Sequence, residues 1–356
     1  MATIRHLKVE NFRSVAAAEW FPKSGLNCLI GPGDSGKSTL LDAIDLVLGA
    51  RRSYSFNDAD FHQMNTENPI RITATLGSLN EELKNLESYG HFLRGFEQST
   101  GKIHDEPQAD LETVLTLQLV VGEDLEPEWR LYSDRAAEEG LERGLKWKHR
   151  ELVHPTRLGA ISHHHLAWGT RSVLNKISEE TFDVSSSLAE LSRQTRVNFA
   201  EQDIPELTQV LEQVRSIANS LGVPVGELKA LLDVKGLSLS NGAISLHNSD
   251  NTPLRQMGTG SSRLLISGLQ KCATKSAIII VDEAEYGLEP YRITRLLQQL
   301  GSKDTNPEQQ VFLTTHSPYV LRELQAEQLH VIRKIPPNHL PPPPQVTHLI
   351  FSLNGG

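Results

Sequence analysis

Apolar residues recur at every second position in several stretches of the first 135 residues, and this period predicts β-strands. The clearest stretch is 112–121, in which the odd positions from Leu115 to Val121 are apolar and the even positions Thr116 and Gln118 are polar. A short, fully apolar run at 26–30 ends at Gly31 and predicts a buried strand followed by a turn. The other strands predicted in this half of the chain are 3–9, 69–76 and 128–133.

The spacing of apolar residues changes to three and four in other stretches, which predicts amphipathic helices. Residues 37–49 carry such a stripe directly after the strand at 26–30. A longer stripe runs from Ile204 to Leu221, with Pro205 suitably placed in the first helical turn, and residues 170–200 also favour helix. These stretches predict a helical arm inserted between two halves of an α/β domain. The stripe could hold a dimer or pack on the chain's own head.

Strand character returns at 237–247, and the apolar runs 276–283 and 310–315 predict buried strands. Helices are predicted at 260–274 and 290–301. The tail at 336–344 contains six prolines, so it predicts either a stiff linker or a proline-rich loop before a last edge strand. The expected organisation is a first lobe with a β subdomain at 1–165, the arm at 166–231, a second lobe at 232–335 and a linker with a terminal strand at 336–356.

Composition narrows the class of protein. The chain has 356 residues, 38% of them hydrophobic, and a formal net charge of −9, which describes a folded globular chain whose surface is not a general nucleic-acid sheath. Two cysteines, Cys28 and Cys272, cannot form a disulfide framework or a cysteine metal site. The chain has no run of 18 apolar residues and no signal peptide at its start. We therefore expect a cytoplasmic protein without a membrane partner.

The turn after the strand at 26–30 carries the strongest chemical signal. It matches the pattern G-x-x-x-x-G-K-[ST], with an apolar strand before it and an amphipathic helix after it. Glycines let successive amides point at phosphate oxygens, while Lys37 reaches the β- and γ-phosphates and Ser38 offers its hydroxyl to Mg²⁺. This predicts an ATP and Mg²⁺ site. The predicted cofactor-binding residues here are Gly31, Pro32, Gly33, Asp34, Ser35, Gly36, Lys37, Ser38 and Thr39.

Two further strand ends carry polar groups suited to the same chemistry. The strand 276–283 ends in Asp282, predicted to hold Mg²⁺, and Glu283, predicted to polarise the attacking water. The next strand, 310–315, is followed by His316, placed to reach the γ-phosphate. The predicted catalytic residues are therefore Glu283, His316 and Lys37.

Together these motifs resemble the ABC-type ATPases, in the branch that contains RecF, SMC proteins and the OLD (overcoming lysogenization defect) family. Residues 7–14 are similar to that branch's opening strand and turn, which implies that Arg13 contacts the nucleotide. Residues 60–62 resemble the OLD pattern after the P-loop helix, and Gln63 is the nearest candidate for the glutamine that bridges Mg²⁺ and water. Residues 285–290 are similar to the D-loop segment of OLD proteins. The resemblance implies an α/β fold: an ABC-type P-loop ATPase head with a mixed β-sheet core, an antiparallel β subdomain and an inserted helical arm.

The resemblance also implies a homodimer, because an ABC head needs a signature motif from a second copy to cap the γ-phosphate. The segment before strand 276–283 stands in the place of that motif but departs from the Leu-Ser-Gly-Gly-Gln of transporters, since a glycine replaces the phosphate-contacting serine. Backbone amides at the start of the following helix could replace it. An ordinary glycine-rich helix cap is the alternative. The residues assigned to this motif are Gly258, Thr259, Gly260 and Ser261.

Other polar clusters are weaker signals. The three histidines at 163–165 have no spacing that would let them share one metal ion. Residues 146–150 mix cations with Trp147, which predicts a solvated strand face more strongly than a nucleic-acid contact. Neither cluster changes the functional prediction.

Two functions remain. The first is an ATP-hydrolysing head of an OLD-family nuclease that controls DNA cleavage, in a family associated with antiphage defence, where a Toprim nuclease domain follows the ATPase. Only about 40 residues follow His316, without an Asp-x-Asp motif, so that nuclease is absent from this chain. The nuclease is then either another subunit or part of a longer natural protein, and we expect the longer protein. The second is a RecF-like DNA-binding clamp without a nuclease. A transporter subunit and a non-hydrolysing module fit the motifs less well.

Overall fold

The computed structural model describes residues 2–158, 163–167, 172–177, 185–200, 205–220, 244–273, 276–335 and 348–352. The chain divides into two units, one formed by Met1–Ile161 with Gly258–Gly356 and the other by Ser162–Met257. Each unit is described by itself below.

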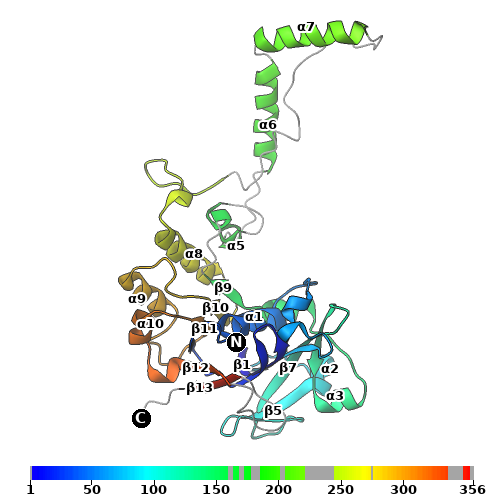
Figure 1. Cartoon of the computed structure of the whole chain (residues 1–356), viewed down its shortest axis with the longest axis vertical. Helices are drawn as coiled ribbons and strands as arrows, with labels where there is room; N and C mark the ends of the chain where they lie inside the picture. Colours follow the sequence, from blue (N-terminus) through cyan, green and yellow to red (C-terminus); the bar gives the residue numbers. More distant parts are fainter. Residues whose placement is uncertain are drawn as a thin grey trace. The chain divides into compact units, whose positions relative to one another are not determined.

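A single mixed β-sheet organises the first unit (Figure 1). Its strand order is β6-β5-β7-β4-β1-β2-β13-β12-β3-β11-β10-β9, and β8 pairs with β7. The strands are β1 (Thr3–Phe12), β2 (Val15–Trp20), β3 (Leu26–Ile30), β4 (Ile70–Gly77), β5 (Leu93–Glu97), β6 (Lys102–His104), β7 (Glu112–Val121), β8 (Pro127–Tyr132), β9 (Thr156–Leu158), β10 (Ile278–Val281), β11 (Gln310–Thr314), β12 (Leu329–Lys334) and β13 (His348–Ser352). The mixed α/β architecture expected from the sequence is confirmed.

Helices flank this sheet, and their start and end points agree with the predicted stripes to within a few residues. The helix predicted at 37–49 is α1 (Lys37–Leu48), that at 260–274 is α8 (Thr259–Ala273), and that at 290–301 is α9 (Pro290–Gln299). The remaining helices of the unit are α2 (Leu86–Tyr89), α3 (Asp134–Glu138), α4 (Trp147–Val153) and α10 (Pro318–Glu323).

Five parallel strands, β9, β10, β11, β3 and β12, form the half of the sheet that leads to the P-loop. Neighbouring residues on these strands belong to different cores, because side chains alternate across a sheet. Ile278, Ile280 and Phe312 join the cluster around α1, whereas Ile279 and Val311 join the cluster around α9. The sheet is therefore covered on both faces, which explains why these strands read as continuous apolar runs.

The antiparallel half of the sheet packs its apolar face on α1, as the two-residue period of 112–121 predicts. Leu117 and Leu119 of β7 pack in the same cluster as Leu40 and Ile44 of α1. The opposite face carries the predicted polar residues, but Thr116 is fully buried and Gln118 is only 5% exposed.

The last strand, β13, corrects one expectation. An edge strand was the alternative for the tail, but β13 lies inside the sheet, antiparallel to β12 and paired with β2 through His348 and Ala18. It thus joins the parallel and antiparallel halves. The proline-rich linker predicted for 336–344 lies outside the described residues.

A second correction concerns residues 146–150. They were expected on a strand face but enter the helix α4, in which the Trp147 indole donates to Glu151 Oε1 one turn later at 2.7 Å. Lys148 pairs with Glu82 at 2.9 Å. The Trp147–Glu151 contact joins positions i and i+4 and so favours a helix, and the short stretch has no two-residue period that would favour a strand.

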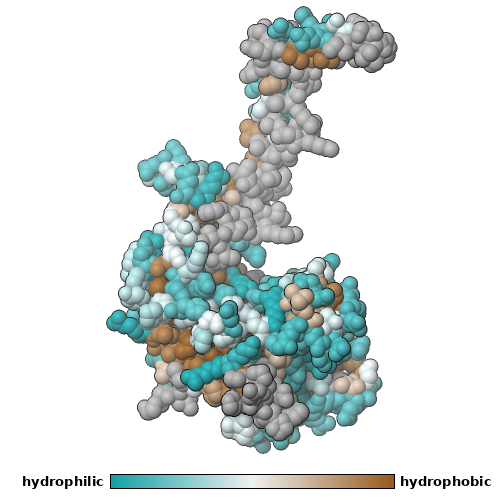
Figure 2. All heavy atoms as spheres, in the orientation of Figure 1, coloured by the Kyte–Doolittle hydropathy of each residue, from teal (hydrophilic) through white to brown (hydrophobic). Residues whose placement is uncertain are grey.

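The second unit contains α5 (Val173–Ile177), α6 (Ser185–Ala200) and α7 (Pro205–Ser220). The helix predicted to begin near Pro205 is α7, in which Val210 and Val214 are 53% and 44% exposed; Figure 2 shows apolar surface on this helix. Of the strand character predicted at 237–247, only 244–247 is described, with isolated bridges at Ser245 and His247. Within the described ranges, no helix is both long and apolar enough to span a membrane.

Candidate nucleotide site

The P-loop connects β3 to α1 in a conformation that depends on its glycines. Gly36 caps α1 in the left-handed region with φ 89°. Gly31 approaches β12 so closely that a Cβ there would lie 2.6 Å from the Ile332 carbonyl oxygen, which no side chain could tolerate. Asp34, with φ 58°, completes the tight wrap. The loop therefore wraps tightly at the start of α1, where the positive end of the helix dipole favours an anion.

Lys37 lies within this loop and is 5% exposed. Its ammonium group donates to the carbonyl oxygens of Gly31, at 3.1 Å, and Pro32, at 2.8 Å. Burial lowers the pKa of Lys37 from its ordinary value, and the nearby Asp282 and Asp34 carboxylates work against that shift. The side chain is thus held among weak neutral acceptors that phosphate oxygens could replace with a stronger, charged contact.

The P-loop helix meets the end of β10 at Asp282. Ser38 Oγ donates to Asp282 Oδ1 at 3.1 Å, and Thr314 Oγ1 donates to the same oxygen at 2.6 Å. A hydroxyl and a carboxylate this close form the oxygen donor set that Mg²⁺ prefers when water and phosphate oxygens complete its shell. The residues present therefore fit Mg²⁺. No cluster of three His, Cys, Asp or Glu side chains that could hold a metal ion occurs among the described residues.

Glu283 follows Asp282 in a strained turn with φ 48°, and its side chain is exposed. The turn is held from both sides: the Glu283 amide donates to Thr314 Oγ1 at 2.8 Å, and Arg263 donates to the carbonyl oxygens of Asp282 and Glu283 at 3.0 and 2.9 Å. Arg263 also donates to the Tyr286 carbonyl. Arg263 lies two residues after the last residue assigned to the signature motif, and the sequence pattern gave it no role. Its contacts make it the residue that fixes the carboxylate turn.

His316 follows β11, and its side chain is exposed. Glu285 holds the segment around it: one carboxylate oxygen accepts from the His316 amide at 2.7 Å and the other from Thr315 Oγ1 at 2.7 Å. The sequence analysis cited Glu285 only as part of the D-loop resemblance. In the structure it joins the turn after β10 to the turn after β11.

The predicted signature segment starts the helix α8. Gly260 packs on the D-loop, where a Cβ would fall well inside van der Waals contact of the Gly287 carbonyl oxygen. Gly258 has open space around it. Thr259 is exposed and Ser261 is half-buried, so the start of the helix remains accessible. The contact of this surface with a second copy stays a prediction.

Arg13 and Gln63 lie in a neighbouring cluster. The Arg13 guanidinium donates to Asp42 of α1 at 2.6 Å and to Asp60 at 2.9 Å, so two of its N–H groups are paired with carboxylates. His62 contacts the Arg13 carbonyl at 2.8 Å, while Gln63 is exposed with φ 56°. The nucleotide contact of Arg13 and the bridging role of Gln63 stay predictions.

Arg157 of β9 is a site residue that sequence reasoning missed. Its guanidinium donates to Asp42 at 2.7 Å and lies 3.7 Å from Asp282 Oδ2. Ion pairs thus run from Asp60 through Arg13, Asp42 and Arg157 to Asp282. The three-residue strand that carries Arg157 is too short for a periodic pattern, so no signal in the sequence singled it out.

A P-loop facing two carboxylates at the end of a parallel strand, with an antiparallel lobe beside it, defines an ABC-type P-loop ATPase head. Solved structures share this fold. The chain is similar to the SMC head domain of Pyrococcus furiosus bound to the C-terminal domain of ScpA, with 13% identity, 99% and 97% coverage of the two chains and a TM-score of 0.52. It is also similar to the SMC head bound to the C-winged helix domain of ScpA, with 15% identity, 98% and 97% coverage and a TM-score of 0.51.

The chain belongs to the ATPase family described as "AAA domain, putative AbiEii toxin, Type IV TA system", which matches residues 26–322. It is 24% identical over 371 residues to the OLD nuclease of Thermus scotoductus, an alignment that covers 93% of this chain and 62% of that protein. It therefore spans about three fifths of this relative's length. The DNA replication and repair protein RecF of Shewanella denitrificans is 33% identical over 82 residues, 23% of this chain and 22% of RecF. The expected relationship to the OLD and RecF branch is confirmed.

Proposed function

We propose that this chain binds Mg-ATP and hydrolyses it, as the head of an OLD-type nuclease. The observation that carries the proposal is the contact of Ser38 with Asp282, because it brings the P-loop and the carboxylates of β10 into one site. Mg²⁺, when bound between these two residues, would neutralise phosphate charge and orient the γ-phosphate.

Other residues of the chain bind the phosphates and activate the attacking water. P-loop amides and Lys37 bind the phosphates and hold the γ-phosphate in place. Glu283 accepts the proton of the attacking water, and its exposed carboxylate is free to do so, while Arg263 keeps the turn beneath it fixed. His316 reaches the γ-phosphate from the neighbouring strand end, with Glu285 setting its position.

The other half of this site comes from a second copy in our proposal. Gly258, Thr259, Gly260 and Ser261 lie at the start of α8, where amides of the first turn have no partner within the helix. Two heads that bind ATP between them would place these amides on the partner's γ-phosphate. ATP would then control a homodimer, located in the cytoplasm, where Mg-ATP is abundant.

Control of DNA cleavage is the finer part of the proposal. It rests on the similarity to the OLD nuclease over 93% of this chain. The nuclease itself would belong to a Toprim domain or subunit outside this sequence, and DNA would be its substrate. Antiphage defence is the biological setting that the resemblance suggests.

ATP turnover tests the enzymatic proposal. Lys37→Ala is expected to abolish nucleotide binding, whereas Glu283→Gln should retain binding and lower turnover by about 10²- to 10⁴-fold, the range for loss of a general base. Glu289→Gln is the matched control, since Glu289 lies in the same loop region and pairs only with Arg292 among the described residues. If Glu283→Gln hydrolyses ATP as fast as Glu289→Gln, Glu283 is not the base.

A RecF-like clamp is the second candidate, favoured by the 33% identity to RecF over part of the chain. It predicts DNA affinity in this chain alone that rises with ATP and falls steeply with salt. Filter binding to duplex DNA with and without ATP distinguishes the two, because the nuclease-head proposal needs no such affinity in the head.

A further inference from the structure

The antiparallel lobe packs its inner face on α1, and its outer face carries polar side chains. Strand register places Lys8 opposite Thr73, Thr73 opposite Gln118, and Gln118 opposite Arg130. These four residues form a row across β1, β4, β7 and β8, since directly paired side chains on one face lie within about 5.5 Å of each other. The row is perpendicular to the strands and faces away from the α1 core.

Hydrogen bonds tie this row into a fixed platform. Arg130 donates twice to Gln118 Oε1, at 3.1 and 3.0 Å, and Gln118 Nε2 donates to Thr73 Oγ1 at 3.2 Å. Two residues further along the same face, the hydroxyls of Thr75 and Thr116 lie 3.0 Å apart and are fully buried. An outer sheet face normally leaves such groups in water, whereas neighbouring side chains cover these two hydroxyls.

A cavity of about 390 Å³ lies over this floor. Its walls carry four cationic side chains, Lys8, Arg71, Arg94 and Arg130, against a single carboxylate, that of Glu10. The chain as a whole has a net charge of −9, so this concentration of cations departs from its average surface. We call this cavity the cationic cup.

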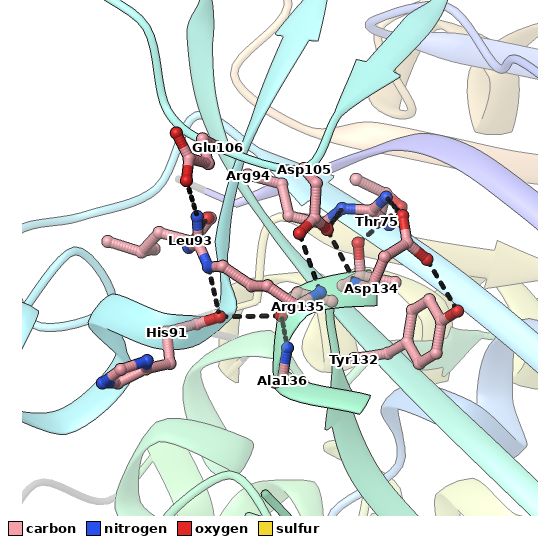
Figure 3. A network of polar contacts seen from close by, with 12 residues as sticks. Thr75, His91, Leu93, Arg94, Asp105, Glu106, Tyr132, Asp134, Arg135 and Ala136 are labelled. Carbon is pink, nitrogen blue, oxygen red and sulfur yellow. Dashed lines mark hydrogen bonds and ion pairs between the residues drawn. The ribbon is translucent and has the colours of Figure 1, made fainter. Parts of the chain in front are cut away.

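The cations differ in how far neighbours neutralise them. Lys8 pairs with Glu10 at 3.0 Å, and Arg94 is fixed between Asp105 and Asp134, as Figure 3 shows, with Tyr132 donating to Asp134 at 2.8 Å. Arg71 is exposed and has no carboxylate within 4.0 Å among the described residues. Arg130 lies 3.9 Å from Glu142. The cup therefore has a wall fixed around Arg94, and Arg71, the cross-strand neighbour of Glu10, is its one cation without an ion pair among the described residues.

We propose that the cationic cup binds a small phosphorylated ligand of nucleotide size. Its volume falls in the range of small-molecule sites, and its lining offers guanidinium, ammonium, hydroxyl and amide donors, which is the chemistry that recognises phosphate. A duplex would meet a flat or convex basic surface, whereas these cations surround a hollow. The inner face of the same strands packs on α1, so the cup is a second anion site, separate from the P-loop.

The phosphate could belong to a free nucleotide or to the end of a nucleic-acid strand, and the test separates these sources. Isothermal titration uses the full chain carrying Lys37→Ala, to remove the P-loop site. The probes are adenosine 5′-monophosphate and a 5′-phosphorylated single-stranded oligonucleotide, each compared with its unphosphorylated form. Arg71→Gln is added to this background, with the exposed Arg295→Gln of α9 as the control of equal charge change.

At least one phosphorylated probe is expected to bind. Its affinity should fall about tenfold with Arg71→Gln, because one charge-assisted contact is lost, and should stay unchanged with Arg295→Gln. The probe that binds identifies the source of the phosphate. The proposal is overturned if neither phosphorylated probe binds, if the unphosphorylated forms bind equally well, or if the two arginine variants have the same effect. Because Arg71 is exposed and lies outside the ATP site, none of these outcomes depends on ATP hydrolysis.

Discussion

Acidification is expected to destabilise the fold through His330, which lies at the seam between the two halves of the sheet. His330 is on β12 and fully buried. Its Nδ1 atom lies 3.3 Å from the Trp20 indole nitrogen and 3.0 Å from Ser352 Oγ. The indole can only donate, so Nδ1 must be the acceptor and the proton of the neutral ring is on Nε2. A second proton on Nδ1 would break the contact with Trp20 of β2.

The size of the effect follows from the pKa. Burial, with a smaller contribution from Lys23, lowers the pKa of His330 to about 4, from 6.5 in the unfolded chain. The unfolded state therefore binds more protons between these values, so stability is complete above about pH 6.5 and is lost as the pH falls toward 4. Linkage gives a loss of about 2.5 kcal/mol between about pH 7.5 and about pH 4.5.

Urea unfolding at these two pH values measures the loss. His330→Gln keeps an acceptor for Trp20 but does not titrate. Between the two pH values, its free energy of unfolding should therefore fall by about 2.5 kcal/mol less than that of the original chain. His91→Gln is the control, because His91 is an exposed histidine. His348, whose pKa burial also lowers to about 4, titrates in all three proteins and cancels. Equal pH dependence in the original chain and His330→Gln would refute the assignment.

Three further changes test other parts of the structure. Arg157→Lys keeps the charge but cannot bridge two carboxylates, so steady-state kinetics should show about tenfold slower ATP turnover with unchanged nucleotide affinity; an unchanged turnover would remove Arg157 from the site. Gly260→Ala should lower the free energy of unfolding by about 1–3 kcal/mol through its clash, whereas Gly268→Ala on the same helix has open space and should not; equal urea midpoints would contradict the packing described. Val210→Glu with Val214→Glu should reduce the mass seen by light scattering if α7 holds a dimer; an unchanged mass would assign dimerisation elsewhere.

Local chemistry made the centre of the fold predictable. The strand β3, the P-loop and α1 are recognisable because each requires a distinct residue type in a fixed order: apolar, then glycine, then an apolar helical stripe. The strands β10 and β11 stand out because both of their faces are covered, so β10 is entirely apolar and β11 is apolar between Gln310 and Thr314. The Asp282 and Thr314 ends of these strands then fall together, as parallel neighbours must.

Features that depend on distant parts of the chain could not be predicted in the same way. The place of β13 between β2 and β12 is set by pairing across about 330 residues of chain, and its own pattern does not distinguish an edge from an interior strand. Arg157 is similar: its strand has three residues, and its role appears only when β9 is placed beside β10. The cationic cup could not be predicted for a different reason. Its polar residues follow a two-residue period, and such a pattern indicates a face that is exposed to solvent.

Asp42 explains why the nucleotide site and its neighbouring loop form one electrostatic unit. It lies on α1, one turn after Lys37, and accepts hydrogen bonds from both Arg13 and Arg157 at 2.6 and 2.7 Å. A carboxylate shared by two arginines cannot lose one without changing its attraction for the other. Any rearrangement that draws Arg13 toward a nucleotide must therefore strengthen the hold of Asp42 on Arg157 and weaken the contact of Arg157 with Asp282. The ion-pair chain thus gives the turn at Arg13 a physical route to the carboxylate that fits Mg²⁺.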